Sequence, residues 1–199
     1  MRWLKQQVRQ RLRQQRLHLD PIQQSRAALL IAHHLFQTTY FQQAHTIALY
    51  HAFVGEVSTL PILDQALKYK SCYFPVLSNS NHLQFVKVES NSKLVKNRFG
   101  IFEPQMPHNA ILAPQALDLV ILPLVAFDAQ GHRLGMGKGY YDQTFAFKRH
   151  QPHKPRLVGL AYDFQKVNRL PHSDLDISLD EIVTDKGIYH PHKSLKKGR

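Results

Sequence analysis

Cysteine is almost missing from this chain, because Cys72 is the only one among 199 residues. An intramolecular disulfide is therefore excluded, and the composition favours a reducing compartment such as the cytoplasm. Cys72 lies in the strand-like segment 71–77, so we expect an inert, buried thiol there.

Long hydrophobic runs are missing as well. No segment approaches the roughly 20 apolar residues that a membrane-spanning helix requires, and the N-terminus has no apolar core like that of a secretory signal. The sequence also has no internal repeat, long linker or low-complexity stretch. Its length and its hydrophobic fraction of 43% predict one globular domain over residues 1–189, followed by a basic, disordered tail at 190–199.

Acidic residues are scarce relative to basic ones, 14 against 26, which gives a net charge of +12. No acid precedes Asp20. Such a balance fits anionic partners, among them nucleotides, polyglutamates, nucleic acid and membrane surfaces. For most of these cations we nevertheless expect a solvated helix face or a frayed tail, and Arg11, Arg13 and Arg16 are assigned to solvent.

The hydrophobic pattern alternates between helices and strands. Leu4, Val8 and Leu12 predict an amphipathic first helix, and Asp20 with Pro21 predicts the start of a second that runs to about residue 37. Further helices are expected at 59–69 and 140–150, a mostly irregular loop at 100–115, and strands at 46–50, 71–77, 83–88, 93–96, 119–122, 157–161 and 181–184. This order predicts a three-layer α/β/α domain with a largely parallel central sheet.

Ligands of such folds bind beyond the carboxyl ends of the strands. Three of these ends carry polar residues. The strand at 46–50 leads to His51 and Glu56, the strand at 119–122 leads to a glycine-rich loop, and the strand at 157–161 leads to Asp163 and Gln165.

The glycine-rich loop, GHRLGMGKGYYD at 131–142, contains four of the nine glycines. Glycine frees the backbone for positive φ, and successive exposed N–H groups form an anion-binding concavity. The loop matches neither G-x-x-x-x-G-K-[ST] nor G-x-G-x-x-G. Spacing alone therefore leaves two interpretations open: a phosphate site, or a flexible turn near the edge of a sheet.

The same residues resemble the signature of the 5-formyltetrahydrofolate cyclo-ligase (methenyltetrahydrofolate synthetase) family. The resemblance runs from about Leu4 to Thr184. It includes Lys5 and Arg9 as Lys-x-x-x-Arg, and it also includes the segments Glu56–Thr59, Gly100–Pro104, Leu170–Pro171, Ser173–Asp174 and Val183–Thr184. The chain departs from the pattern at Ser58, Leu124 and Gln143, where the family commonly has Asp, Gly and Arg.

The resemblance implies an ATP-dependent cyclisation. The formyl oxygen of 5-formyltetrahydrofolate attacks the γ-phosphate of MgATP, and the bridge nitrogen then closes the ring. The departure of phosphate gives 5,10-methenyltetrahydrofolate. It also implies the family's three-layer α/β fold. A monomer is expected, with small-molecule partners only: ATP and the folate, with or without a polyglutamate tail, but neither nucleic acid nor membrane.

The resemblance assigns roles to individual residues. Catalytic roles fall to Lys138 and Tyr140, and the magnesium ligand is Asp142. The residues implied to bind ATP are Lys5, Arg9, Arg133, Leu134, Gly135, Met136, Gly137, Lys138, Gly139, Tyr140 and Tyr141. Those implied to bind the folate are His51, Glu56, Phe99, Met136, Gly137, Lys138, Gly139 and Tyr140.

Each assignment has a plainer alternative. Lys5 and Arg9 lie one helical turn apart and are otherwise two exposed cations. Arg133 can grip phosphate in a bidentate fork, or can form a salt bridge that holds the loop. Asp142 can bind Mg²⁺, or can complement the dipole of the following helix.

The remaining named residues also have structural alternatives. His51 and Phe99 can equally be structural side chains, and Glu56 an exposed loop residue. Of the two tyrosines, family position favours Tyr140 on the folate and Tyr141 on the nucleotide.

Two other functions remain as alternatives. The charge of +12 would suit a nucleic-acid-binding protein, although no RRM, KH or helix-turn-helix signature is visible. An α/β isomerase acting on sugar phosphates would need neither ATP nor the Lys5–Arg9 pair.

Overall fold

The computed structural model describes residues 2–78, 82–97, 100–105, 111–151 and 154–191. Its centre is an eight-stranded sheet with the order β12-β11-β10-β7-β1-β2-β3-β6. The five strands from β11 to β2 are parallel, whereas β12, β3 and β6 run antiparallel to their neighbours. The strands are β1 Thr46–Ala48, β2 Ser71–Leu77, β3 Leu83–Val88, β6 Ile111–Leu112, β7 Leu119–Pro123, β10 Arg156–Ala161, β11 Glu181–Thr184 and β12 Gly187–Tyr189.

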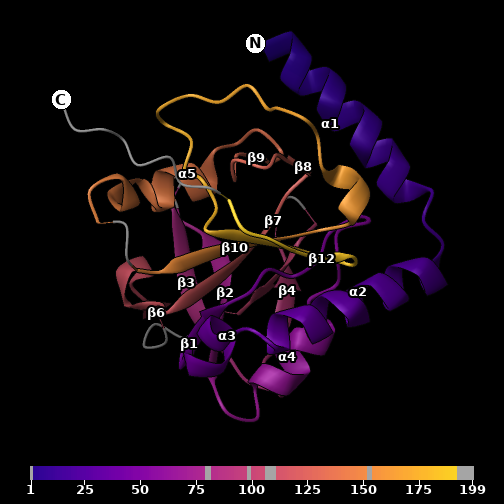
Figure 1. The fold of residues 1–199 in the computed structure, drawn as a ribbon. Coiled ribbons are helices and arrows are strands. Elements are labelled where there is room, and N and C mark those ends of the chain that lie inside the picture. The colour runs from indigo at the N-terminus through magenta and orange to yellow at the C-terminus, as the bar shows by residue number, and fades with distance from the viewer. Residues whose placement is uncertain (1, 79–81, 98–99, 106–110, 152–153, 192–199) are drawn as a thin grey trace.

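Both faces of the sheet are covered, which is why the central strands are continuously apolar. Alternate residues of β7 point to opposite faces. Leu119 and Ile121 join the hydrophobic cluster formed with α2, α3 and α4, whereas Val120 and Leu122 join the cluster around Phe145. The three-layer α/β prediction is therefore confirmed (Figure 1).

The two helical layers differ in thickness. One holds α2 (Pro21–Phe36), α3 (Thr39–Gln43) and α4 (Leu60–Ala66), and the other holds α5 (Tyr140–Thr144) with the 3₁₀ segment Ala146–Arg149. Helix α2 begins at the predicted capping box. The Asp20 carboxylate accepts the Gln23 N–H at 2.8 Å, and the Gln23 amide oxygen accepts the Asp20 N–H at 3.1 Å.

Helix α1 (Arg2–Leu17) lies outside these layers, against the carboxyl-end edge of the sheet (Figure 1). Its buried Leu12 packs with Val125, Ala126 and Leu134 of the β8–β9 hairpin (Ala126–Phe127 and Arg133–Leu134). The opposite side of the helix is exposed and includes Trp3, which is 71% exposed. The hairpin thus fixes the helix beside the predicted glycine loop.

Some local predictions were wrong. Two short strands were missed in the segment 100–115, which was expected to be mostly irregular: Phe102–Pro104 forms β5, which pairs with β4 (Leu94–Lys96), and Ile111–Leu112 extends the main sheet as β6. The helix expected at 140–150 ends at Thr144 and continues as a 3₁₀ segment. Helix α3 and strand β12 were not predicted.

The structure bears on three further predictions. Cys72 is fully buried, as predicted, and burial raises the pKa of its thiol to about 11. Within the residues the structure describes, no helix combines the length and apolarity needed to cross a membrane. Of the predicted basic tail, 192–199 lies outside the described residues.

Candidate active site

The central residues of the glycine-rich loop, 135–139, lie at the carboxyl-end edge of the sheet, between the β8–β9 hairpin and α5 (Figure 1). Gly137 and Gly139 have φ angles of 96° and 72°, and Gly139 caps α5. A side chain would strain both positions. At Gly137 an added Cβ would also come within 3.3 Å of the Arg9 guanidinium. The loop is therefore a tight turn with its backbone next to a cation.

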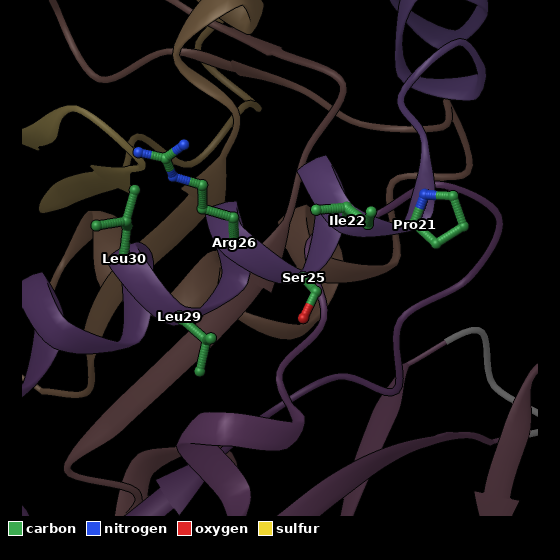
Figure 2. Close-up of a pocket in the computed structure, with 6 residues that line it drawn as sticks. All are labelled: Pro21, Ile22, Ser25, Arg26, Leu29 and Leu30. Carbon is green, nitrogen blue, oxygen red and sulfur yellow. The ribbon is translucent and has the colours of Figure 1, made fainter.

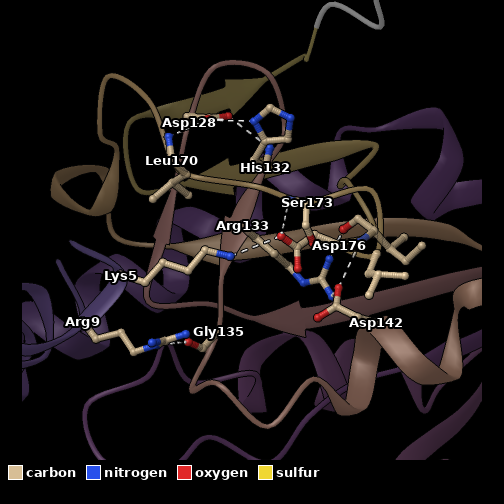
Figure 3. Close-up of polar contacts among 12 residues, drawn as sticks. Lys5, Arg9, Asp128, His132, Arg133, Gly135, Asp142, Leu170, Ser173 and Asp176 are labelled. Atoms are coloured by element: carbon tan, nitrogen blue, oxygen red, sulfur yellow. Dashed lines mark hydrogen bonds and ion pairs between the residues drawn. The ribbon is translucent and has the colours of Figure 1, made fainter. Parts of the chain in front are cut away.

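Helix α1 brings the predicted pair of cations to this loop. The Arg9 Nε donates a hydrogen bond to the Gly135 carbonyl oxygen at 2.8 Å, and the Lys5 Nζ lies 3.3 Å from a carboxylate oxygen of Asp176. Both side chains are half-buried and point toward the loop and the segment that follows Leu170 (Figure 3). The alternative of two freely solvated cations is therefore excluded.

Lys138 is the exposed cation of the loop. Across the described chain, no carboxylate lies within ion-pair distance of its ammonium. Met136 is also exposed, at 48%, and Tyr140 is half-buried. The loop therefore presents a cation and its backbone to an incoming anion, whereas Leu134 is 3% exposed and belongs to the core.

Arg133 has the structural role that the sequence analysis kept as an alternative. Its guanidinium donates to the Asp142 carboxylate at 2.7 Å and to the Ile177 carbonyl oxygen, and its side chain is only 6% exposed. The same Asp142 oxygen accepts the Ile177 N–H at 3.0 Å. Both terminal nitrogens of Arg133, which were expected to bind phosphate, therefore join α5 to the segment around Ile177 (Figure 3).

Glu56 lies in a turn after β1 rather than in a solvated loop. Its carboxylate accepts the Phe53 N–H at 3.0 Å. Burial raises the pKa of Glu56, against the opposing effects of the Phe53 hydrogen bond and of the positive charges on Arg16 and Arg13. A half-buried carboxylate with one filled hydrogen-bonding position is a suitable acceptor for N–H donors of a ligand.

The two tyrosines after the loop share the edge of the apolar cluster that contains Phe145. Burial, together with the negative charge of Glu56, raises the pKa of Tyr141. Tyr141 therefore lies within electrostatic range of Glu56, a residue that the resemblance assigns, like Tyr140, to the folate. The division of Tyr140 to folate and Tyr141 to nucleotide stays a prediction.

His51 is half-buried between two aromatic rings. Its ring centroid lies 5.1 Å from that of Phe102 and 6.2 Å from that of Phe74. Phe102 itself is 37% exposed, so this aromatic group borders the same edge of the sheet as Glu56. Phe99 lies outside the described residues.

Gln165 and Asp163, at the third strand end, serve the fold. The Gln165 amide donates to the carbonyl oxygens of Leu124 and Val125 at 3.0 and 2.8 Å. Asp163 accepts hydrogen bonds from Tyr189 and Thr184. The Gln165 contacts hold the turn that leads from β7 into the hairpin, and the Asp163 contacts join the end of β10 to β11 and β12.

Asp128, which the sequence analysis did not single out, organises the base of the hairpin. Its fully buried carboxylate accepts the backbone N–H groups of Gln130, His132 and Leu170 and contacts the His132 imidazole at 2.9 Å. These four contacts come from three residues and engage both oxygens; Figure 3 shows His132 and Leu170 beside Asp128. A local turn signal, Asp followed by Gly131, was the only hint in the sequence.

Replacing Asp128 by alanine should lower the free energy of unfolding by about 3 kcal/mol, because several buried N–H donors lose their acceptor. Urea denaturation of the purified variant measures this. Asp174→Ala, at an exposed position of the following loop, serves as the control and should change little. An Asp128→Ala variant as stable as the wild type would contradict this role.

Asp176 was missed because it lies in coil, where no periodicity marks functional positions. The family resemblance pointed to Asp174, which is exposed, whereas Asp176 pairs with Lys5 and accepts the Ser173 N–H at 2.9 Å. It directly precedes Ile177, whose N–H donates to Asp142. The two carboxylates therefore flank one short segment at the loop.

The magnesium ligand that the resemblance implies, Asp142, stays a prediction. In the parts of the chain that the structure describes, no group of three or more His, Cys, Asp or Glu side chains could hold a metal ion. Mg²⁺ needs only one or two protein carboxylates when nucleotide phosphates and water complete its shell. Asp142 and Asp176, 29% and 32% exposed at their side chains, fit that requirement.

A separate hollow lies on the outer face of α2, away from the strand ends (Figure 2). Its lining is mainly apolar, and Arg26 is its one charged residue. The hollow is formed by Pro21, Ile22, Ser25, Arg26, Leu29 and Leu30. None of these residues comes from the loop, so the hollow plays no part in the site.

Comparison with known proteins identifies the family of the chain. The model of the 5-formyltetrahydrofolate cyclo-ligase family matches residues 2–185. The chain belongs to this family. The cyclo-ligase match spans α1, the Glu56 turn, the glycine loop and the segment with Asp176, so it includes every part of the site described above.

Individual cyclo-ligases cover nearly the whole chain. The chain is 38% identical to the 5-formyltetrahydrofolate cyclo-ligase of Escherichia coli over 89% of its own length and 98% of the relative's. It is 36% identical to that of Haemophilus influenzae over 90% and 96%. The structure of Aquifex aeolicus 5,10-methenyltetrahydrofolate synthetase superposes with a TM-score of 0.81 at 33% identity, covering 98% of this chain and 95% of the other.

Proposed function

We propose that the protein catalyses the ATP-dependent cyclisation of 5-formyltetrahydrofolate to 5,10-methenyltetrahydrofolate, with release of ADP and phosphate, at the glycine loop. Family membership supplies the reaction. The observation that carries the location is the exposed Lys138, which has no carboxylate partner in the described chain and lies between positive-φ glycines beside Arg9.

The nucleotide side of the site consists of the loop backbone and the cations of α1. Phosphoryl transfer depends mainly on positioning and on neutralising charge. Arg9 uses its Nε on the Gly135 carbonyl oxygen, which leaves its terminal N–H groups next to Gly137 for a phosphate. Lys5 adds a second charge that Asp176 holds in place.

Two steps complete the reaction. The formyl oxygen attacks the γ-phosphorus of ATP, and the bond to the β–γ bridging oxygen breaks, so that ADP leaves. The bridge nitrogen then uses its lone pair to attack the formyl carbon. The carbon–oxygen bond breaks, phosphate carries the electron pair away, the bridge nitrogen loses its proton to solvent, and the five-membered ring is closed. Lys138 stabilises negative charge on the transferring phosphoryl group, and Tyr140 orients the formyl group.

The folate side is the Glu56 turn. Its carboxylate accepts N–H groups of the pterin, a pairing that burial strengthens because the local dielectric is low. Mg²⁺ would be held by Asp142 and Asp176, with phosphate oxygens and water, and would supply charge neutralisation. That the protein is a cytoplasmic monomer and accepts polyglutamylated folate stays a prediction.

Absorbance at the methenyl product band tests the function. Purified protein with MgATP and 5-formyltetrahydrofolate should generate the band, and omission of either substrate should abolish it. ADP should appear in a one-to-one ratio with product. A folded sample at high concentration that yields no band would overturn the proposal, whereas tight, salt-sensitive RNA binding by that sample would favour a nucleic-acid protein.

Substituting Arg9 by alanine should raise the KM for ATP roughly tenfold or more, because a charge-assisted contact to phosphate is lost. The KM for the folate should change much less, and steady-state kinetics with each substrate varied in turn separates the two effects. Arg11→Ala is the matched control, since Arg11 lies on the same helix but is exposed. Equal effects of the two substitutions would remove Arg9 from the nucleotide site.

A further inference from the structure

Arg16, in the last turn of α1, is buried although the sequence assigned it to solvent. It is only 3% exposed, so that prediction was wrong. Burial lowers the pKa of Arg16, but an arginine remains charged at every ordinary pH. A buried charge needs compensating contacts, and the neighbours of Arg16 show what it does.

The guanidinium of Arg16 joins two segments of the site. One terminal nitrogen donates to the Val54 carbonyl oxygen at 3.1 Å, in the turn that carries Glu56, and the other lies 3.4 Å from the Leu124 carbonyl oxygen, after β7. The stem of Arg16 also packs on Gly55, where an added Cβ would come within 3.5 Å of the Arg16 Cβ. The position of the turn thus depends on α1.

The charge of Arg16 also acts on Glu56. The titratable and charged groups around Glu56 come from four places: Arg13 and Arg16 on α1, Tyr50 after β1, Tyr141 on α5 and Tyr162 after β10. The three tyrosines are neutral, since burial is the main factor raising each of their pKa values. Besides the Phe53 N–H, the two arginines stabilise the ionised carboxylate, and of the two arginines only Arg16 is buried.

We propose that Arg16 is a positioning residue for the folate: it holds the 53–56 turn in place and presents Glu56 as an ionised carboxylate, while fixing that turn to the helix that carries Lys5 and Arg9. The proposal rests on the proposed function. It explains why a cation is buried where neither phosphate nor pterin needs to contact it. Arg16 acts through Glu56 and does not itself touch the reacting atoms.

Two substitutions separate the charge of Arg16 from its hydrogen bonds. Arg16→Lys keeps the positive charge but loses the paired terminal nitrogens of the guanidinium. Arg16→Gln keeps a hydrogen-bond donor but has no charge. Kinetics with 5-formyltetrahydrofolate and MgATP are measured from about pH 5.5 to about pH 8.5, a range above the usual pKa of Glu. Arg11→Gln, at an exposed position of the same helix, is the control.

Both substitutions should raise the KM for the folate roughly five- to tenfold at neutral pH, the effect of losing one or two hydrogen bonds that hold the turn. The acid limb, where the KM for the folate rises as Glu56 gains a proton, should move to higher pH in Arg16→Gln and stay near its wild-type position in Arg16→Lys. In a Glu56→Gln background, Arg16→Lys should change the KM for the folate by less than about twofold.

A purely structural role predicts a different result. It would lower the melting temperature of both variants but leave the KM for the folate and its pH profile at wild-type values, which would overturn the proposal. If Arg16→Gln does not fold, the KM of Arg16→Lys and its non-additivity with Glu56→Gln decide the matter. Failure of the proposed function is distinct, because the wild type would then form no methenyl product at any pH.

Discussion

Replacing Lys138 by alanine is expected to lower kcat about a thousandfold while the protein remains folded. Negative charge builds up on the phosphoryl group during transfer, and Lys138 is the loop cation that has no carboxylate partner within the described residues. Its exposure means that the fold does not depend on it. The KM for ATP should rise far less than kcat falls, because the lysine acts mainly in the transition state.

Single-turnover formation of the methenyl product measures this effect, and circular dichroism verifies the fold. Lys68→Ala removes another exposed lysine, on the helical side opposite α5, and should retain full activity. Wild-type turnover in Lys138→Ala would remove this side chain from the mechanism and leave charge neutralisation to Arg9 and Lys5.

Replacing Glu56 by glutamine is expected to raise the KM for 5-formyltetrahydrofolate about a hundredfold, since a carboxylate with two acceptor oxygens becomes an amide with one. Burial raises the pKa of Glu56 above its usual range. As the pH falls through that raised pKa, the carboxylate gains a proton and pterin binding weakens. The wild type should therefore show an increasing KM toward acidic pH, and the variant a flat profile.

Initial rates at several pH values, with saturating MgATP, measure both effects. Glu89→Gln provides the control, because Glu89 is exposed at the end of β3. A Glu56→Gln variant with an unchanged KM for the folate would place the pterin elsewhere. If the acid limb persisted in the variant, another group would be responsible for it.

The regular parts of the fold were predictable because their signals are local. The capping box at Asp20 and Gln23 defines the start of α2 from four consecutive residues, and the apolar run of β7 identifies a strand covered on both faces. The shorter elements were not. Strand β5 pairs with β4, and β6 depends on β3, so their existence follows from pairing that two or three residues cannot encode alone.

The site shows the same division. The glycine loop and the Lys5–Arg9 spacing are sequence motifs, and the structure brings them together. Arg16 contacts residues 38 and 108 positions away, and Lys5 contacts Asp176, 171 positions away. No local pattern reveals that a cation on a basic helix is buried by a turn so distant in sequence.

The exposed indole on α1 gives this protein a built-in spectroscopic reporter. Trp3 is the single tryptophan of the chain, is 71% exposed and lies two residues before Lys5. All tryptophan emission therefore originates from the helix that carries Lys5 and Arg9, and none comes from the sheet. Fluorescence excited selectively at this residue would follow the seating of that helix in real time, without a label and without interference from the core.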